Sequence, residues 1–152
     1  MIIVRYLHDF INEVLIMTKT IFKPLLLAFY CTSKWLVNKK MPQNLVPSTI
    51  LTFSFPFTFI ATGIFCMYIL ERILNTVKSP IVCVVGVLLF ISPVYYFSGK
   101  IAKNGIHEWG IEKDYKFLTK NERINKIVTA FIFFWGAFIF QFWLANIAIS
   151  SM

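Results

Sequence analysis

Charged residues are scarce in this sequence. Only 14% of its 152 residues are Asp, Glu, Lys or Arg, against roughly 25% in an ordinary soluble domain, and 58% are apolar. No charged residue stands between Lys40 and Glu71, or after Lys126. Because an uncharged run of about 20 residues is long enough to cross a bilayer as a helix, the composition predicts an all-α integral membrane protein.

Histidine is also rare, and neither of the two histidines stands in a metal-binding motif. His107 is followed by Glu108, but no second histidine comes four residues after the first, as an H-E-x-x-H zinc site requires. His8, with Asp9 and Glu13, fits the solvated side of an amphipathic helix. The sequence therefore predicts no metal and no cofactor.

Nucleophile motifs are missing as well. Cys31, Cys66 and Cys83 form no C-x-x-C pair, and we expect them to be small buried hydrophobes, with a disulfide between Cys66 and Cys83 left open. No serine or cysteine stands in a glycine-flanked elbow, and the acidic residues are confined to helix ends and loops. We predict no catalytic residue, and hence a protein that is not an enzyme.

What the sequence does have is basic charge, with a net charge of +8. A basic nucleic-acid-binding domain gathers its Lys and Arg on a folded polar face, whereas here they stand only in the gaps between apolar runs. The expected partner is a bilayer with anionic head groups, and not nucleic acid. The residues expected to contact lipid head groups or a protein partner are Arg5, Lys19, Lys23, Lys39, Lys40, Lys100, Lys103, Lys116, Lys120, Arg123 and Lys126.

Residues 1–23 have the pattern of an amphipathic helix. The apolar positions recur at spacings of four and three, and most charged side chains fall on the opposite half. Such a helix lies in the membrane interface or packs on a partner helix. We expect Pro24 to break it. A crossing over residues 14–33 is disfavoured, because Lys19 and Lys23 would each cost roughly 2.5 to 3.5 kcal/mol inside the bilayer, although a re-entrant helix stays open.

Three membrane crossings are predicted, at about 49–70, 80–99 and 127–149. They form a helical membrane domain over residues 48–152 that contains a cytoplasmic loop at 100–126, while residues 1–47 form an N-terminal region and linker on the cytoplasmic face. Ser48 or Thr49 opens the first crossing, and the short connection to the second makes the two an antiparallel hairpin.

Local motifs predict where the helices around the loop begin and end. Asn104-Gly105 has the composition of a left-handed cap at the end of the second crossing. Thr119 and Glu122 form a capping box, which opens the third helix.

Polar residues within the crossings are few. In a bilayer such side chains face protein or water, so each marks a helix contact or the lining of a pore. The candidates are Thr52, Thr58, Thr62, Gln141 and Asn146.

Two functions are compatible with these features. In the first, the chain is a non-catalytic membrane subunit that anchors or scaffolds a larger complex through its N-terminal helix and basic loop. In the second, identical chains form a channel, a pore or a membrane-disrupting assembly. Both require other protein chains, identical or different, because three helices cannot by themselves surround a water path. The expected location is the plasma membrane, the inner membrane of a bacterium.

The basic residues predict the orientation of the chain. Six of the fifteen Lys and Arg residues precede residue 48, seven lie in 100–126, and only Arg72 and Lys78 remain for the other side. The side with more Lys and Arg faces the cytoplasm. A phosphatase that is active only outside the cytoplasm should therefore be active when fused after Met152. If a reporter fused after Met152 were instead found in the cytoplasm, this topology would be wrong.

Overall fold

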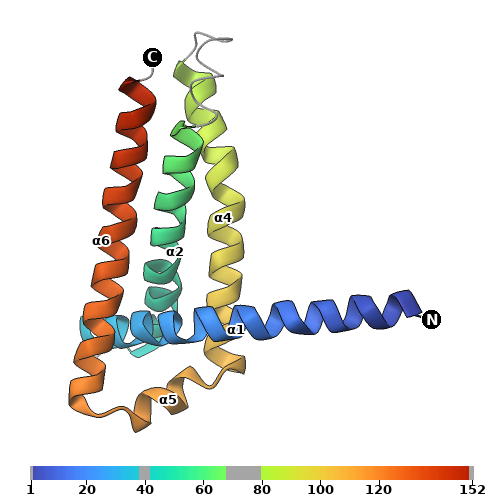
Figure 1. The fold of residues 1–152 in the computed structure, drawn as a ribbon. Helices are drawn as coiled ribbons and strands as arrows, with labels where there is room; N and C mark the ends of the chain where they lie inside the picture. Colours follow the sequence, from blue (N-terminus) through green and yellow to red (C-terminus); the bar gives the residue numbers. More distant parts are fainter. Residues whose placement is uncertain (1, 38–41, 68–79, 151–152) are drawn as a thin grey trace.

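The computed structural model describes residues 2–37, 42–67 and 80–150, without the side chains of 2–15, 42, 80, 83, 148 and 149. All regular structure in these residues is helical. The elements are α1 (Ile2–Leu36), the short 3-10 helix η1 (Pro42–Asn44), α2 (Leu45–Phe65), α4 (Pro80–Glu108), α5 (Ile111–Phe117) and α6 (Lys120–Ser150). Figure 1 shows α2, α4 and α6 side by side, with α1 running across one end of them.

Three of these helices are long and apolar enough to cross a membrane, at Leu45–Phe65, Val84–Glu108 and Lys120–Ile147. The prediction of three spans is thereby confirmed, and α1 is not among them despite its 35 residues. Within the spans, 44% of α2 is buried, against 6% of α4 and 17% of α6, because α2 packs along both of the others. α2 is the central span, and α4 and α6 present most of their side chains outward.

The predicted start of α6 is confirmed in detail. The backbone N–H of Thr119 donates to Glu122 Oε2 at 2.7 Å, and the backbone N–H of Glu122 donates to Thr119 Oγ1 at 3.3 Å. These reciprocal bonds satisfy two backbone donors that would otherwise lack partners in the first turn. α6 then runs without interruption to Ser150.

The predicted start of the first span is wrong by about one turn. α2 begins at Leu45, directly after η1, and not at Ser48 or Thr49. Pro47 therefore lies in the first helical turn, where its missing N–H has no carbonyl to bond and its fixed φ suits the helix. Pro47 is thus part of the first span.

The predicted break at Pro24 is also wrong, because α1 continues through this proline to Leu36. A proline inside a helix costs about 3 kcal/mol, and Pro24 is exposed, so its own burial offsets little of that cost. The residues that follow do offset it. Leu26 is fully buried, and Leu27 and Phe29 are nearly so. Each fully buried side chain of this size contributes about 1.5 to 3 kcal/mol, so three of them exceed the cost of the proline.

The cap predicted at Asn104-Gly105 is not present, and α4 continues past it to Glu108. The left-handed residue is Gly110, with φ of 67°, between α4 and α5. Gly105 serves a different purpose. A Cβ placed on it would lie 2.7 Å from Leu26 Cδ2 and 2.8 Å from the Trp109 ring. The absence of a side chain lets α1 approach α4 at this point.

Replacing Gly105 by alanine tests this close approach. We expect G105A to lower the free energy of unfolding in detergent by about 1 to 3 kcal/mol, because the added Cβ would overlap both the fully buried Leu26 and the Trp109 ring. The matched control is G136A in α6, where a Cβ meets no atom within 4 Å. G136A should leave the stability unchanged or raise it, since alanine favours the helix. Equal thermal stability of the two variants would contradict the packing described.

Candidate functional site

The most continuously buried segment of the described chain is the part of α1 that crosses one end of the spans. Eight consecutive residues, Leu26 to Ser33, are all buried, and none is more than 8% exposed. A helix that lies on a surface buries only one side, so burial all round means that α1 has neighbours in every direction. These neighbours are α2, α4, α5 and α6. We call this region the crossing, defined by residues 26–33 and the side chains that contact them.

Aromatic rings fill the side of the crossing that faces the spans. Phe29 lies between Phe53 of α2, at a ring-centroid distance of 5.9 Å, and Phe133 of α6, at 6.3 Å. Phe57 contacts Phe53 at 5.1 Å and Phe133 at 5.8 Å, which completes the cluster. Tilted and edge-on ring pairs of this kind are favourable beyond the area that they bury. The cluster ties α1 to both α2 and α6.

Polar and charged groups lie on the other side of the crossing, against α5. The Tyr30 ring packs on Tyr115 at 5.6 Å, and the Arg123 guanidinium lies 4.4 Å from the centre of the Tyr115 ring. Lys23 Nζ is 2.8 Å from Asp114 Oδ2, which joins α1 to α5. Both side chains of this ion pair are about one third exposed, so it contributes at most about 1 kcal/mol. The predicted loop thus packs as an ordered cover over α1.

Residues 26–33 contain two ionisable side chains, Tyr30 and Cys31. Burial raises the pKa of the Cys31 thiol to about 11, although the nearby Lys126 and Arg123 act in the opposite direction. Burial also raises the pKa of Tyr30, and Glu112 adds to that shift. A thiol with a raised pKa is a poor nucleophile and a poor metal ligand. Cys31 is therefore packing material at the crossing.

The structure places the three predicted threonines on α2, with their hydroxyls bonded to the backbone of the same helix. Thr52 donates to the carbonyl of Ser48 at 2.8 Å, Thr58 to that of Phe55 at 2.7 Å, and Thr62 to that of Thr58 at 2.7 Å. Thr58 is buried, and Thr52 and Thr62 are half-buried. Because each hydroxyl already donates its hydrogen to a carbonyl, its oxygen can only accept a hydrogen bond in any further contact.

Gln141 and Asn146 lie on different sides of α6. Gln141 is half-buried and faces α2, where its Cα would be 3.1 Å from a Cβ placed on Gly63. This is the closest approach between those two helices that any glycine in the described residues provides. Asn146 is exposed. The structure therefore brings Gln141 to a helix contact and leaves Asn146 on the outer surface of the span.

The predicted basic residues lie around the end of the bundle that α1 crosses. Lys23 and Lys116 are paired, Lys116 with Glu112 at 3.2 Å, and Arg123 stacks on Tyr115. Lys126 is half-buried. Those that are exposed are Lys19, Lys100, Lys103 and Lys120. The side chain of Arg5 and the whole of Lys39 and Lys40 lie outside the described residues.

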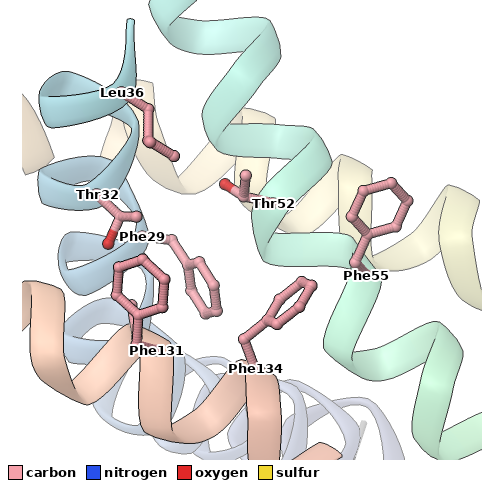
Figure 2. A pocket seen from close by; sticks show the side chains of 8 residues that line it. Phe29, Thr32, Leu36, Thr52, Phe55, Phe131 and Phe134 are labelled. Atoms are coloured by element: carbon pink, nitrogen blue, oxygen red, sulfur yellow. The ribbon is translucent and has the colours of Figure 1, made fainter. Parts of the chain in front are cut away.

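An apolar pocket of about 220 Å³ opens beside the crossing. Figure 2 shows its walls, which come from the last turns of α1, from α2 and from α6. The two polar residues that line it, Thr32 and Thr52, donate their hydroxyl hydrogens to the carbonyls of Ala28 and Ser48. The other lining residues are Phe29, Leu36, Phe55, Ala130, Phe131 and Phe134.

The residues considered for chemistry are not brought together. In the described part of the chain, no three His, Cys, Asp or Glu side chains form a group suited to a metal ion. His107 and Glu108 are both exposed at the end of α4. The side chains of His8, Asp9, Glu13 and Cys83 lie outside the described residues, so the open disulfide between Cys66 and Cys83 stays a prediction. No protein-family model matches the chain, and no curated protein or solved structure matches it either.

Reasoning from sequence missed both the crossing and the pocket. Ser33 is fully buried and its hydroxyl lies 3.2 Å from that of Thr52, yet nothing in its local sequence marks it. One signal was available. The ten uncharged residues between Lys23 and Lys34 are too few to span a bilayer and too uniformly apolar for an amphipathic helix, which is the pattern of a short segment buried on all sides.

The burial of Cys31 predicts slow alkylation. A pKa of about 11 in place of 9.0 lowers the thiolate fraction at neutral pH roughly 100-fold, and only the thiolate reacts. In a C66S/C83S variant at pH 7.5, maleimide should label Cys31 at least about 100-fold more slowly in the folded protein than in dodecyl sulfate. A C31S/C83S variant, which keeps the half-buried Cys66, is the control for reagent access. Similar folded and unfolded rates for Cys31 would rule out the burial described.

Proposed function

We propose that this chain is a non-catalytic subunit of a membrane complex, which it anchors or scaffolds by holding a long helix at the membrane surface. The observation that carries the proposal is the asymmetry of α1. Its C-terminal part is locked into the crossing by residues 26–33, while its N-terminal part extends past the three spans (Figure 1). A fold that holds one end of a long helix firmly and lets the other end extend past the bundle is suited to presenting the extended part to another molecule.

The N-terminal part of α1 has the chemistry of a contact surface. Where the helix leaves the bundle, Met17 and Ile21 are spaced four residues apart on one side and are 63% and 61% exposed. The apolar positions Phe10 and Val14 continue the same series toward the N-terminus. Exposed apolar side chains in such a row are a feature of protein or membrane contact sites. We call residues 2–21 of α1 the arm.

We further propose that the arm and the α5 region face the cytoplasm, with the C-terminus outside. What supports this topology is that α1 and α5 pack against each other at the same end of the spans, where the basic residues also gather. A helix that lies across the ends of the spans sits at the depth of the lipid head groups, where Lys and Arg meet anionic lipid. The plasma membrane of a bacterium is the proposed location.

The proposal that the subunit is not an enzyme is supported by where the polar groups of the spans point. The hydroxyls of Thr49, Ser54 and Ser98 bond to carbonyls of their own helices, as do those of the three predicted threonines. A membrane enzyme needs polar groups that converge at one depth and remain free to act on a substrate. Here the same groups already have backbone partners in the helices that carry them.

A homo-oligomeric channel, pore or membrane-disrupting assembly is the second candidate, and one observation favours it. The face of α6 turned away from α2 carries residues at alternating spacings of four and three, the heptad repeat of packed helices. Gly136 on this face is open, so another backbone has room to approach closely, and Asn146 exposes an amide that a bilayer does not satisfy. The whole series is Asn125, Thr129, Ile132, Gly136, Ile139, Trp143, Asn146 and Ser150.

One experiment separates the two candidates. The mass of the protein expressed alone is measured in nanodiscs for the native sequence, for M17D/I21D in the arm and for G136L/N146L on α6. For an anchor subunit we expect a monomer in all three cases. In the natural host, a co-purifying protein should cross-link to the arm, and this cross-link should be lost in M17D/I21D but kept in G136L/N146L. T20D is the matched control, since Thr20 is exposed on another side of the same helix.

The opposite results favour the second candidate. A ring of identical chains that dissociates in G136L/N146L, together with ion flux in liposomes, would refute the anchor proposal. A monomer that becomes stable only with a different protein would refute the homo-oligomer.

A further inference from the structure

The apolar pocket beside the crossing results from the way α1 separates two spans. α2 and α6 meet directly farther along, where Phe59 contacts Phe134 at 5.5 Å and Phe138 at 5.4 Å. Near the crossing, Phe29 of α1 lies between Phe53 of α2 and Phe133 of α6, and a direct contact between the two spans remains at Phe57 and Phe133. Two helices that diverge from a contact leave a wedge-shaped space, of which α1 forms the base. The aromatic cluster fills part of this space, and the pocket is the part that remains.

The walls of the pocket suit a hydrocarbon and not water. Six of the eight lining residues are apolar, and both threonine hydroxyls have given their only hydrogen to a backbone carbonyl. A water molecule in a cavity needs two to four polar partners, and these walls offer it no donor. The volume of about 220 Å³ is below the roughly 300 to 1,000 Å³ of pockets that hold a drug-sized molecule. A narrow, flexible chain fits such a space.

A positive charge lies one helical turn from the pocket. Lys126 precedes the lining residue Ala130 by four positions, which places the two on the same face of α6. In the described part of the chain the ion pairs join Lys23 to Asp114 and Lys116 to Glu112, and Lys126 is in neither. Glu122 is the carboxylate one turn before it, and Thr119 holds that group through two hydrogen bonds. Lys126 therefore acts on Glu122 and on the Cys31 thiol only through its field, and it is in neither ion pair of the described residues.

We propose that the pocket binds one acyl chain of an anionic phospholipid, whose head group is held by Lys126. The apolar walls take the chain, and the lysine at the end of the bundle attracts the phosphate, an arrangement suited to a lipid of the cytoplasmic leaflet. The lipid replaces the side-chain contacts that α2 and α6 lack where α1 separates them. It therefore acts as part of the packing of the crossing, and the proposal does not depend on whether the chain is an anchor or a channel.

The test uses the whole protein in nanodiscs of phosphatidylcholine with one tenth phosphatidylglycerol, released into detergent and weighed by native mass spectrometry. We expect one retained phosphatidylglycerol per chain. L36W should abolish this retention, because Leu36 points into the pocket in Figure 2, and at 56% exposure it accepts a larger side chain without disturbing the core. The matched control is I132W on the outer face of α6, where Ile132 is 68% exposed. The control should retain the lipid.

A second pair of variants tests the head group separately. K126Q should lower the preference for phosphatidylglycerol over phosphatidylcholine about fivefold, whereas K120Q, on the same helix but farther from Ala130 and exposed, should leave it unchanged. Because Lys126 is half-buried and unpaired in the described residues, K126Q is expected to fold, which melting temperature confirms independently. Retention of lipid by L36W, or equal retention of the two lipids by the native protein, would overturn the proposal.

Discussion

The burial of eight consecutive residues of α1 between the spans is the constraint on which the rest of the structure depends. It keeps the helix continuous through a proline, and it brings Tyr30 and Lys23 onto α5. It also sets the separation of α2 and α6 near the crossing. Three spans with apolar outer surfaces gain little from one another in a bilayer, since lipid tails are as apolar as their side chains. The helix inserted between them supplies the aromatic and polar contacts that specify one arrangement.

The features of this fold that sequence predicts well are the local ones. The spans follow from uncharged runs of sufficient length, and the start of α6 follows from Thr119 and Glu122, because both depend on residues close together in the chain. The path of α1 does not follow in this way. A proline has a local cost that can be estimated from sequence, whereas the burial that outweighs it involves Phe53 and Phe133, which are distant in sequence. Tertiary packing overrides the local preference at this position.

The two glycines near the end of α4 show the same limit of prediction from local sequence. Asn104-Gly105 has the composition of a helix end, and a glycine in a helix interior is unfavourable, so a cap is the natural prediction. In the structure Gly105 lies within α4, and Gly110 is the residue with positive φ. The same residue type serves a close helix contact at one position and a left-handed turn at the other. What distinguishes Gly105 from Gly110 is that Leu26 of α1 lies against Gly105, and this contact is between residues distant in sequence.

During synthesis, the ribosome makes Phe29 well before its ring partner Phe133. These rings are in contact, yet about one hundred residues separate them in sequence, and a ribosome adds roughly 5 to 20 residues per second. Residues 26–33 are therefore made several seconds before the helix that covers them. During that interval the segment has no neighbours from α6, and the last span to enter the membrane completes the core. Truncation before Phe133 leaves residues 26–33 without one of their walls, so two segments about one hundred residues apart form a single folding unit.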